Sequence, residues 1–110
     1  MDLLYEFIGE IGGTFLFILI ILIVVQSKYL NAKTASINIG LPIGLGLALS
    51  IFIFGGLSKT HFNPALSFIM FLKDPRIFSL NMLIIYVIAQ LIGGFCALKI
   101  NENFIKSLTF

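Results

Sequence analysis

Three long apolar stretches alternate with short polar connections along this chain. They cover residues 5–26, 37–57 and 77–98, and each has close to the roughly 20 residues that a helix needs to cross a bilayer. Polar residues separate the first stretch from the second, and a longer connection from Ser58 to Arg76 separates the second from the third. The pattern predicts three transmembrane helices in a single unit spanning residues 1–110, without linkers or internal repeats.

A fourth apolar run, residues 63–72, lies inside the second connection. Ten helical residues rise about 15 Å, which is half of a hydrocarbon core of about 30 Å. Irregular backbone at membrane depth is tolerated only where it is buried in protein or faces a water-filled cavity. We therefore expect a re-entrant half-helix, and we expect the chain to act as a channel or carrier.

The composition agrees with a membrane location. The chain is 59% hydrophobic and 11% charged, with a mean hydropathy of +1.10, which excludes an ordinary soluble domain. A net charge of +2 is too small for a nucleic-acid partner. The start of the chain carries Asp2 and Glu6 and no Lys or Arg, so we expect a membrane helix there and not a signal peptide. The expected partner is the lipid bilayer, and the expected location is the plasma membrane.

The cationic residues do not define an orientation. If the N-terminus is cytoplasmic, three cations face the inside and four face the outside, namely Lys59, Lys73 and Arg76 against Lys28, Lys33, Lys99 and Lys106. The positive-inside rule needs an excess of Lys and Arg on one side of the membrane, and the two sides here are nearly equal, so the rule does not assign an orientation.

The sequence His61-Phe62-Asn63-Pro64-Ala65 opens the short apolar run. Asn is a preferred N-cap and Pro a preferred first helical residue, so the pair predicts a helix start, and it is compatible with an ordinary helix start as well as with a functional one. At mid-membrane, such a start points a positive partial charge into the protein interior, which repels cations. Asn63 also has an amide that can donate to a water molecule or a hydroxyl group.

Two further polar residues lie within the long apolar stretches. Glu10 either faces the interior of the bundle, as a functional or structural anchor, or extends toward the membrane interface. Gln90 shares a helix face with Tyr86, Gly93 and Ala97 and needs buried partners, which an irregular loop backbone would provide. His61 has no second ligand for a metal, so we expect it at a pore mouth or in a structural role.

Glycines spaced about one turn apart predict close helix packing at Gly9 and Gly13 and at Gly40, Gly44 and Gly46. The sequence contains no paired carboxylates, no Cys–His couple and no phosphate loop, so we expect no enzyme activity, no cofactor and no bound metal.

Three segments together resemble the first half of a major intrinsic protein, the aquaporin and aquaglyceroporin family. Glu10 with Gly13-Thr14-Phe15 resembles the first-helix pattern of that family. Residues 58–67 resemble its Asn-Pro-Ala segment, and residues 86–94 its third helix.

The resemblance implies an all-α membrane fold in which two inverted halves, each with three helices and one half-helix, enclose a pore for water or small neutral solutes. Asn63, Pro64 and Ala65 would form one of two tips that meet at mid-membrane. Glu10 and Gln90 would hold the loop, and carbonyl groups of about residues 56–61 would line a vestibule. Ile43 matches a selectivity position, where an aliphatic side chain would suit a wider constriction than that of a strict water channel.

The chain departs from the family pattern in two respects. Lys59-Thr60 replaces a small pair, and the 110 residues match only one half. We therefore expect transport only after pairing with an inverted second half, as an antiparallel homodimer or with a separate polypeptide. Two alternatives stay open: a truncated fragment without transport activity, and a small proton-coupled exporter of dual topology that uses Glu10.

Overall fold

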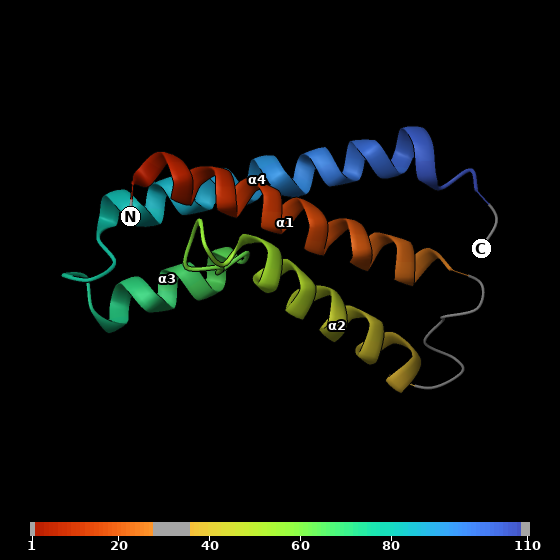
Figure 1. Cartoon of the computed structure of the whole chain (residues 1–110), viewed down its shortest axis with the longest axis horizontal. Helices are drawn as coiled ribbons and strands as arrows, with labels where there is room; N and C mark the ends of the chain where they lie inside the picture. Colours follow the sequence, from red (N-terminus) through yellow and green to blue (C-terminus); the bar gives the residue numbers. More distant parts are fainter. Residues whose placement is uncertain (1, 28–35, 109–110) are drawn as a thin grey trace.

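The described residues fold into four α-helices and a short π-helical stretch, arranged as in Figure 1. The computed structural model describes residues 2–27 and 36–108, and no strand occurs among them. The elements are α1 (Leu3–Gln26), α2 (Ser36–Phe54), α3 (Pro64–Lys73), α4 (Leu80–Ile100) and η1 (Asn101–Ile105), which continues α4.

Three of these helical segments are long and apolar enough to cross a membrane, namely Leu3–Gln26, Ile37–Phe54 and Leu80–Ile105, whereas α3 is shorter. The chain is therefore an all-α integral membrane protein, as the pattern of apolar stretches predicted. The re-entrant position of α3 and the three membrane crossings stay predictions.

Two helix ends differ from the sequence prediction because local hydrogen bonds determine where these helices stop or start. The second helix ends at Phe54, before the predicted end at residue 57, because the Phe54 carbonyl accepts from Leu57 N at 2.9 Å and closes a turn. The last helix starts at Leu80, after the predicted start at residue 77, because the Ser79 side chain caps it by accepting from Met82 N. It also continues beyond residue 98, into η1.

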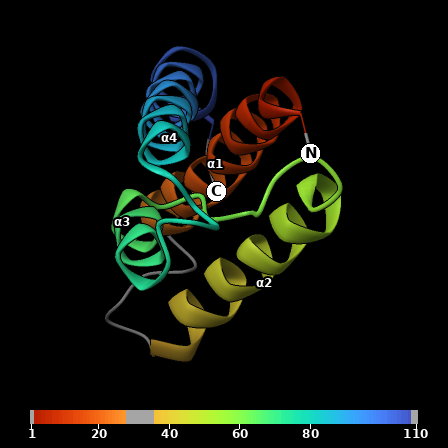
Figure 2. The same cartoon turned by 90° about the vertical axis from the view of Figure 1, so that its left-hand side faces the viewer.

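α1 and α4 run parallel and side by side along the long axis of the molecule, and theirs is the most extensive contact between helices (Figures 1 and 2). α2 runs in the opposite direction and packs on α1. Much of α2 lacks a protein neighbour: Leu41, Leu45 and Phe52 are among its exposed side chains. The described residues therefore form an open bundle in which α2 is the least covered of the three long helices.

α3 is the element that departs from a simple helical hairpin. It packs against α4, and its first turn lies near the middle of the long axis while its last turn lies at the end where α1 and α4 begin (Figure 1). Asn63 Oδ1 accepts from Ala65 N at 2.9 Å and Pro64 occupies the first helical position, so the predicted helix start is confirmed.

Glycine allows the closest approach of α1 and α4. A Cβ at Gly93 would collide with the Ile11 carbonyl oxygen and would lie 3.0 Å from Phe15 N. Both atoms belong to the backbone and cannot rotate away. The neighbouring Gly94 is open by comparison, since its nearest contact would be Ile18 Cγ1 at 4.0 Å.

We expect Gly93→Ala to destabilise the protein by about 2 kcal/mol, the usual cost of overpacking, and Gly94→Ala to change stability little. Circular dichroism during titration from mild detergent into SDS would measure both variants. Equal stability of the two variants would contradict the backbone contact.

The predicted glycine contacts are only partly present. Gly9 packs against Leu57 and Ser58, Gly13 against the Phe62 ring and Gly46 against Ile20, whereas a Cβ at Gly40 or Gly44 would meet no atom within 4 Å. Gly9 and Gly13 therefore make room for the loop before α3, and the predicted close packing is absent at Gly40 and Gly44 within the described residues.

Candidate functional site

The Glu10 carboxylate organises the loop between α2 and α3. It is 0% exposed and accepts four hydrogen bonds. Oε2 accepts from Ser58 Oγ at 2.7 Å and His61 N at 3.1 Å, and Oε1 from Phe62 N at 2.8 Å and Gln90 Nε2 at 2.9 Å. Two backbone N–H groups of an irregular loop thus have a charged partner inside the bundle. We call Glu10, Ser58, Ser67 and Gln90 the loop anchor.

The loop adopts a backbone conformation that is unusual for its residues. Thr60 and Phe62 both have φ of 56°, in the left-handed region that residues other than Gly and Asn rarely occupy. Thr60 N donates to Ser58 Oγ at 3.0 Å, and Phe62 N donates to Glu10. The buried Phe62 ring lies against Gly13. Each strained residue is therefore held by a polar contact of its own backbone N–H.

A second buried carboxylate fastens the start of the loop. The Tyr86 hydroxyl donates to Glu6 Oε1 at 2.6 Å and accepts from Lys59 N at 3.1 Å. Glu6 is 3% exposed and Tyr86 is fully buried. The contact joins α1, α4 and the loop in one chain of hydrogen bonds.

His61 is enclosed by α3 and α4. Its Nδ1 lies 2.8 Å from Ser67 Oγ, which accepts from Gln90 Nε2 at 2.9 Å. Its ring packs at 4.9 Å from the Phe78 ring and 5.0 Å from that of Tyr86. Burial lowers the pKa of His61 from its ordinary value, although the nearby Glu10 opposes that shift. The imidazole is therefore neutral at pH 7, which suits a structural contact with Ser67.

The tip of α3 is exposed, in contrast to the buried loop anchor. Asn63, Pro64, Ala65 and Leu66 all have exposed side chains. Ile43 lies apart from this cluster, half-buried on α2. The structure thus brings Glu10, Gln90 and His61 together, places Asn63 to Ala65 beside them at the helix start, and leaves Ile43 on another helix.

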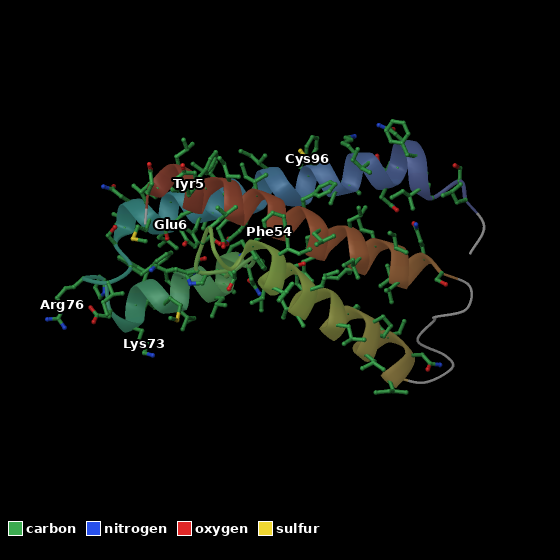
Figure 3. All side chains as sticks on the ribbon, viewed as in Figure 1. Tyr5, Glu6, Phe54, Lys73, Arg76 and Cys96 are labelled. Atoms are coloured by element: carbon green, nitrogen blue, oxygen red, sulfur yellow. The ribbon has the colours of Figure 1, made fainter. Side chains whose placement is uncertain are left out.

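Cations gather at the far end of α3. Lys73 and Arg76 point away from the helices there (Figure 3), and Arg76 Nε lies 3.3 Å from Asp74 Oδ1 in an exposed ion pair. Lys59 and Lys73 line a cavity of about 220 Å³ that reaches His61 and Phe78. Two positively charged side chains therefore line the cavity that leads to the loop.

Sequence reasoning missed Glu6, Ser58 and Ser67, which take part in the hydrogen bonds around the loop. A signal for one of them was present, because Glu6 lies four residues before Glu10 and so shares its helix face. The face predicted for Tyr86, Gln90, Gly93 and Ala97 is confirmed, since all four are buried in α4. The serines carried no such signal, because their role depends on the fold of the loop.

The described part of the chain contains no cluster of three His, Cys, Asp or Glu side chains arranged to hold a metal. The loop anchor can hold the irregular loop rigidly at the middle of the molecule and so fix the position of the start of α3.

Comparison with known proteins places this sequence in a family. The sequence model of the family "Major intrinsic protein" matches residues 1–109. An aquaglyceroporin of Toxoplasma gondii is 52% identical over 42 residues, which cover 38% of this chain and 16% of that protein. No solved structure matches the chain. Since the family match extends over nearly the whole sequence, the chain belongs to the major intrinsic protein family.

Proposed function

We propose that the chain is one half of a channel that passes water or small neutral solutes passively across a membrane after pairing with an inverted second half. The observation that carries the proposal is the start of α3, exposed near the middle of the long axis and held there by the loop anchor. Family membership supports the same activity. The proposal includes no chemical step and no cofactor, and it places the protein in the plasma membrane.

The helix start supplies selectivity against ions. The first N–H groups of a helix carry a positive partial charge, and at mid-membrane this charge is poorly screened. Because Asn63 Oδ1 is engaged with Ala65 N, the Asn63 amide hydrogens remain for a passing hydroxyl. A neutral solute that accepts hydrogen bonds is therefore favoured over a cation.

An alternative, the proton-coupled exporter, has less support from the geometry. Glu10 is fully buried and has four donors, so protonating it would break contacts that hold the loop. The other alternative, a fragment without transport activity, is an outcome of the flux experiment below.

The flux experiment uses purified protein in liposomes, with water and glycerol permeation followed by stopped-flow light scattering. We expect flux of both above that of lipid alone and no proton flux. Ile43→Phe should reduce glycerol flux severalfold and water flux less, because the larger ring narrows the proposed constriction. Leu45→Phe is the matched control on an exposed part of α2. Flux equal to that of lipid alone would refute a channel made of two copies of this chain and would leave a separate second half or an inactive fragment.

The re-entrant position of α3 predicts a specific labelling pattern. In a Cys96→Ser background, the double variant Lys59→Cys with Lys73→Cys should acquire either no label or two labels from a membrane-impermeant maleimide, since both sites would lie on one side. Lys73→Cys with Lys99→Cys should acquire one label. Intact-mass spectrometry counts labels per molecule, so the result holds for any mixture of orientations. One label on the first pair would show that α3 crosses the membrane.

A further inference from the structure

The cavity at the far end of α3 combines two cationic side chains with apolar walls. Lys59 and Lys73 line it together with Met70, Ile77 and Phe78, and its volume is about 220 Å³. At about 30 Å³ for each water molecule in the liquid, the cavity has room for roughly seven water molecules. It can therefore hold a small charged group, such as a phosphate with part of its glycerol, but not a whole lipid.

The two ammonium groups have no anionic partner within the described residues. The ion pairs there join Arg76 to Asp74 and Lys99 to Glu102, and neither pair includes Lys59 or Lys73. The Asp74 carboxylate also lines the cavity, but its Oδ1 accepts from Arg76 N at 3.0 Å and from Arg76 Nε at 3.3 Å. Two like charges beside one small cavity repel each other, so an anion between them would lower the free energy of both.

Both lysines extend from backbone that is held in place. Lys59 N donates to the Tyr86 hydroxyl at 3.1 Å, and that hydroxyl donates to the buried Glu6 carboxylate. Lys73 is the last residue of α3, and Asp74 caps the helix directly after it. The positions from which the two side chains reach the cavity are therefore fixed by the fold.

The surroundings of the cavity favour a lipid over a free phosphate ion. Lys73 lies at the end of the molecule where α1 and α4 begin and α3 ends (Figures 1 and 3). α1 and α4 are long enough to cross a membrane, so in the predicted membrane arrangement their first turns lie near its surface, at the depth of the lipid headgroups. Leu72 and Ile77, next to the cavity, are 57% and 69% exposed, and acyl chains would cover them.

We propose that this cavity binds the phosphate group of an anionic phospholipid, with Lys59 and Lys73 donating to its oxygens and the acyl chains lying outside against Leu72 and Ile77. Hydrogen bonds from ammonium groups to phosphate are charge-assisted, and basic pockets on membrane proteins bind lipid headgroups in this way. Lys59 is one of the two residues that replace a small pair in the family pattern, so the site is particular to this chain. The inference does not depend on whether the chain conducts solutes.

Native mass spectrometry of the purified chain in a neutral detergent tests the site, because it resolves each bound lipid. The probe is phosphatidylglycerol, and the comparison is phosphatidylcholine, whose phosphate is offset by its own cation. We expect Lys59→Gln and Lys73→Gln each to weaken binding of the first phosphatidylglycerol about fivefold, which corresponds to about 1 kcal/mol for each cation. Lys59→Arg should retain binding. Equal affinity of the parent for the two lipids would overturn the proposal.

Lys106→Gln is the matched control. Lys106 is exposed and has the exposed Phe104 and Leu108 near it in the sequence, so this variant also removes one charge beside apolar side chains. Lys106 is not among the residues that line the cavity, and we expect its loss to leave binding unchanged. With folding of all variants verified by circular dichroism, an equal loss of binding in Lys106→Gln and Lys73→Gln would show attraction by overall charge and refute the site.

Inorganic phosphate distinguishes the two sources of a phosphate group. We expect it to displace phosphatidylglycerol only at concentrations far above that of the lipid, because it lacks the acyl chains that contact Leu72 and Ile77. Inorganic phosphate that binds as tightly as phosphatidylglycerol would show that the ligand is the free ion, and the assignment to a lipid would be wrong.

Discussion

Replacing Glu10 with Leu is expected to abolish stable folding in mild detergent. The change leaves four donors without an acceptor, namely Ser58 Oγ, His61 N, Phe62 N and Gln90 Nε2. At about 1–3 kcal/mol for each unsatisfied buried donor, the loss is about 4 kcal/mol or more, a large part of the stability of a small protein. Because the chain contains no Trp, helicity by circular dichroism in mixtures of mild detergent and SDS is the suitable measurement.

Glu10→Gln provides an informative comparison. The amide oxygen still accepts from part of the loop, but the amide nitrogen faces N–H donors and the charge is lost. We expect about 2 kcal/mol of destabilisation, roughly half the loss in the Leu variant, in line with the greater strength of charge-assisted hydrogen bonds. Glu102→Leu is the control, because Glu102 is exposed and forms a surface ion pair with Lys99, which contributes little to stability. A Glu10→Leu protein as stable as the parent, but without proton-coupled transport, would support the exporter alternative.

The helices were predictable from this sequence because the lipid bilayer dictates their length and composition. In hydrocarbon, every backbone polar group needs an internal partner, so long apolar stretches become helices with few alternatives. The start of α3 was predictable for a local reason, since Asn63 and Pro64 act within one turn. The ends of α2 and α4 were less predictable, because they depend on the turn at Phe54 and the Ser79 cap.

The loop anchor shows what spacing along a helix can and cannot reveal. Glu10 and Gln90 stood out as polar residues in apolar stretches, and each was expected to need partners. That Gln90 donates to the same Glu10 carboxylate that holds the loop required the close packing of α1 on α4 at Gly93. The positive φ of Thr60 and Phe62 had no counterpart in the sequence, because neither residue favours that conformation and only the surrounding contacts impose it.

The buried face of α4 and the exposed face of α2 bear on the pairing of halves. α1 and α4 bury their polar residues against the loop, whereas α2 leaves Gly40 and Gly44 without a neighbour within 4 Å. In membranes, small residues on a helix mark places where another backbone can approach. In the proposed channel, an inverted half would cover α2 as well as the tip of α3, and orientation would be a condition for activity.

Forcing all copies into one orientation should therefore reduce solute flux to that of lipid alone. We infer from the near-even distribution of Lys and Arg that the parent inserts both ways, and small changes in such a balance reverse a topology. One variant replaces Lys99 and Lys106 with Gln, and the other replaces Lys73 and Arg76 with Gln; neither touches the loop anchor. Each variant alone should insert in one orientation, opposite to that of the other variant, and should conduct no solute.

Mixing the two variants is the decisive step, because only the mixture contains antiparallel pairs. In such a pair both α3 helices point their N-termini at the midplane, so the barrier to cations is kept, while the tips contain Leu66 and no cationic side chain. We expect co-reconstitution to restore flux of water and small neutral solutes, measured by stopped-flow light scattering, with orientation determined by protease protection of terminal tags. Full activity of either variant alone in a verified single orientation would refute the antiparallel homodimer. Flux of both the parent and the mixture equal to that of lipid alone would point instead to a separate polypeptide as the second half.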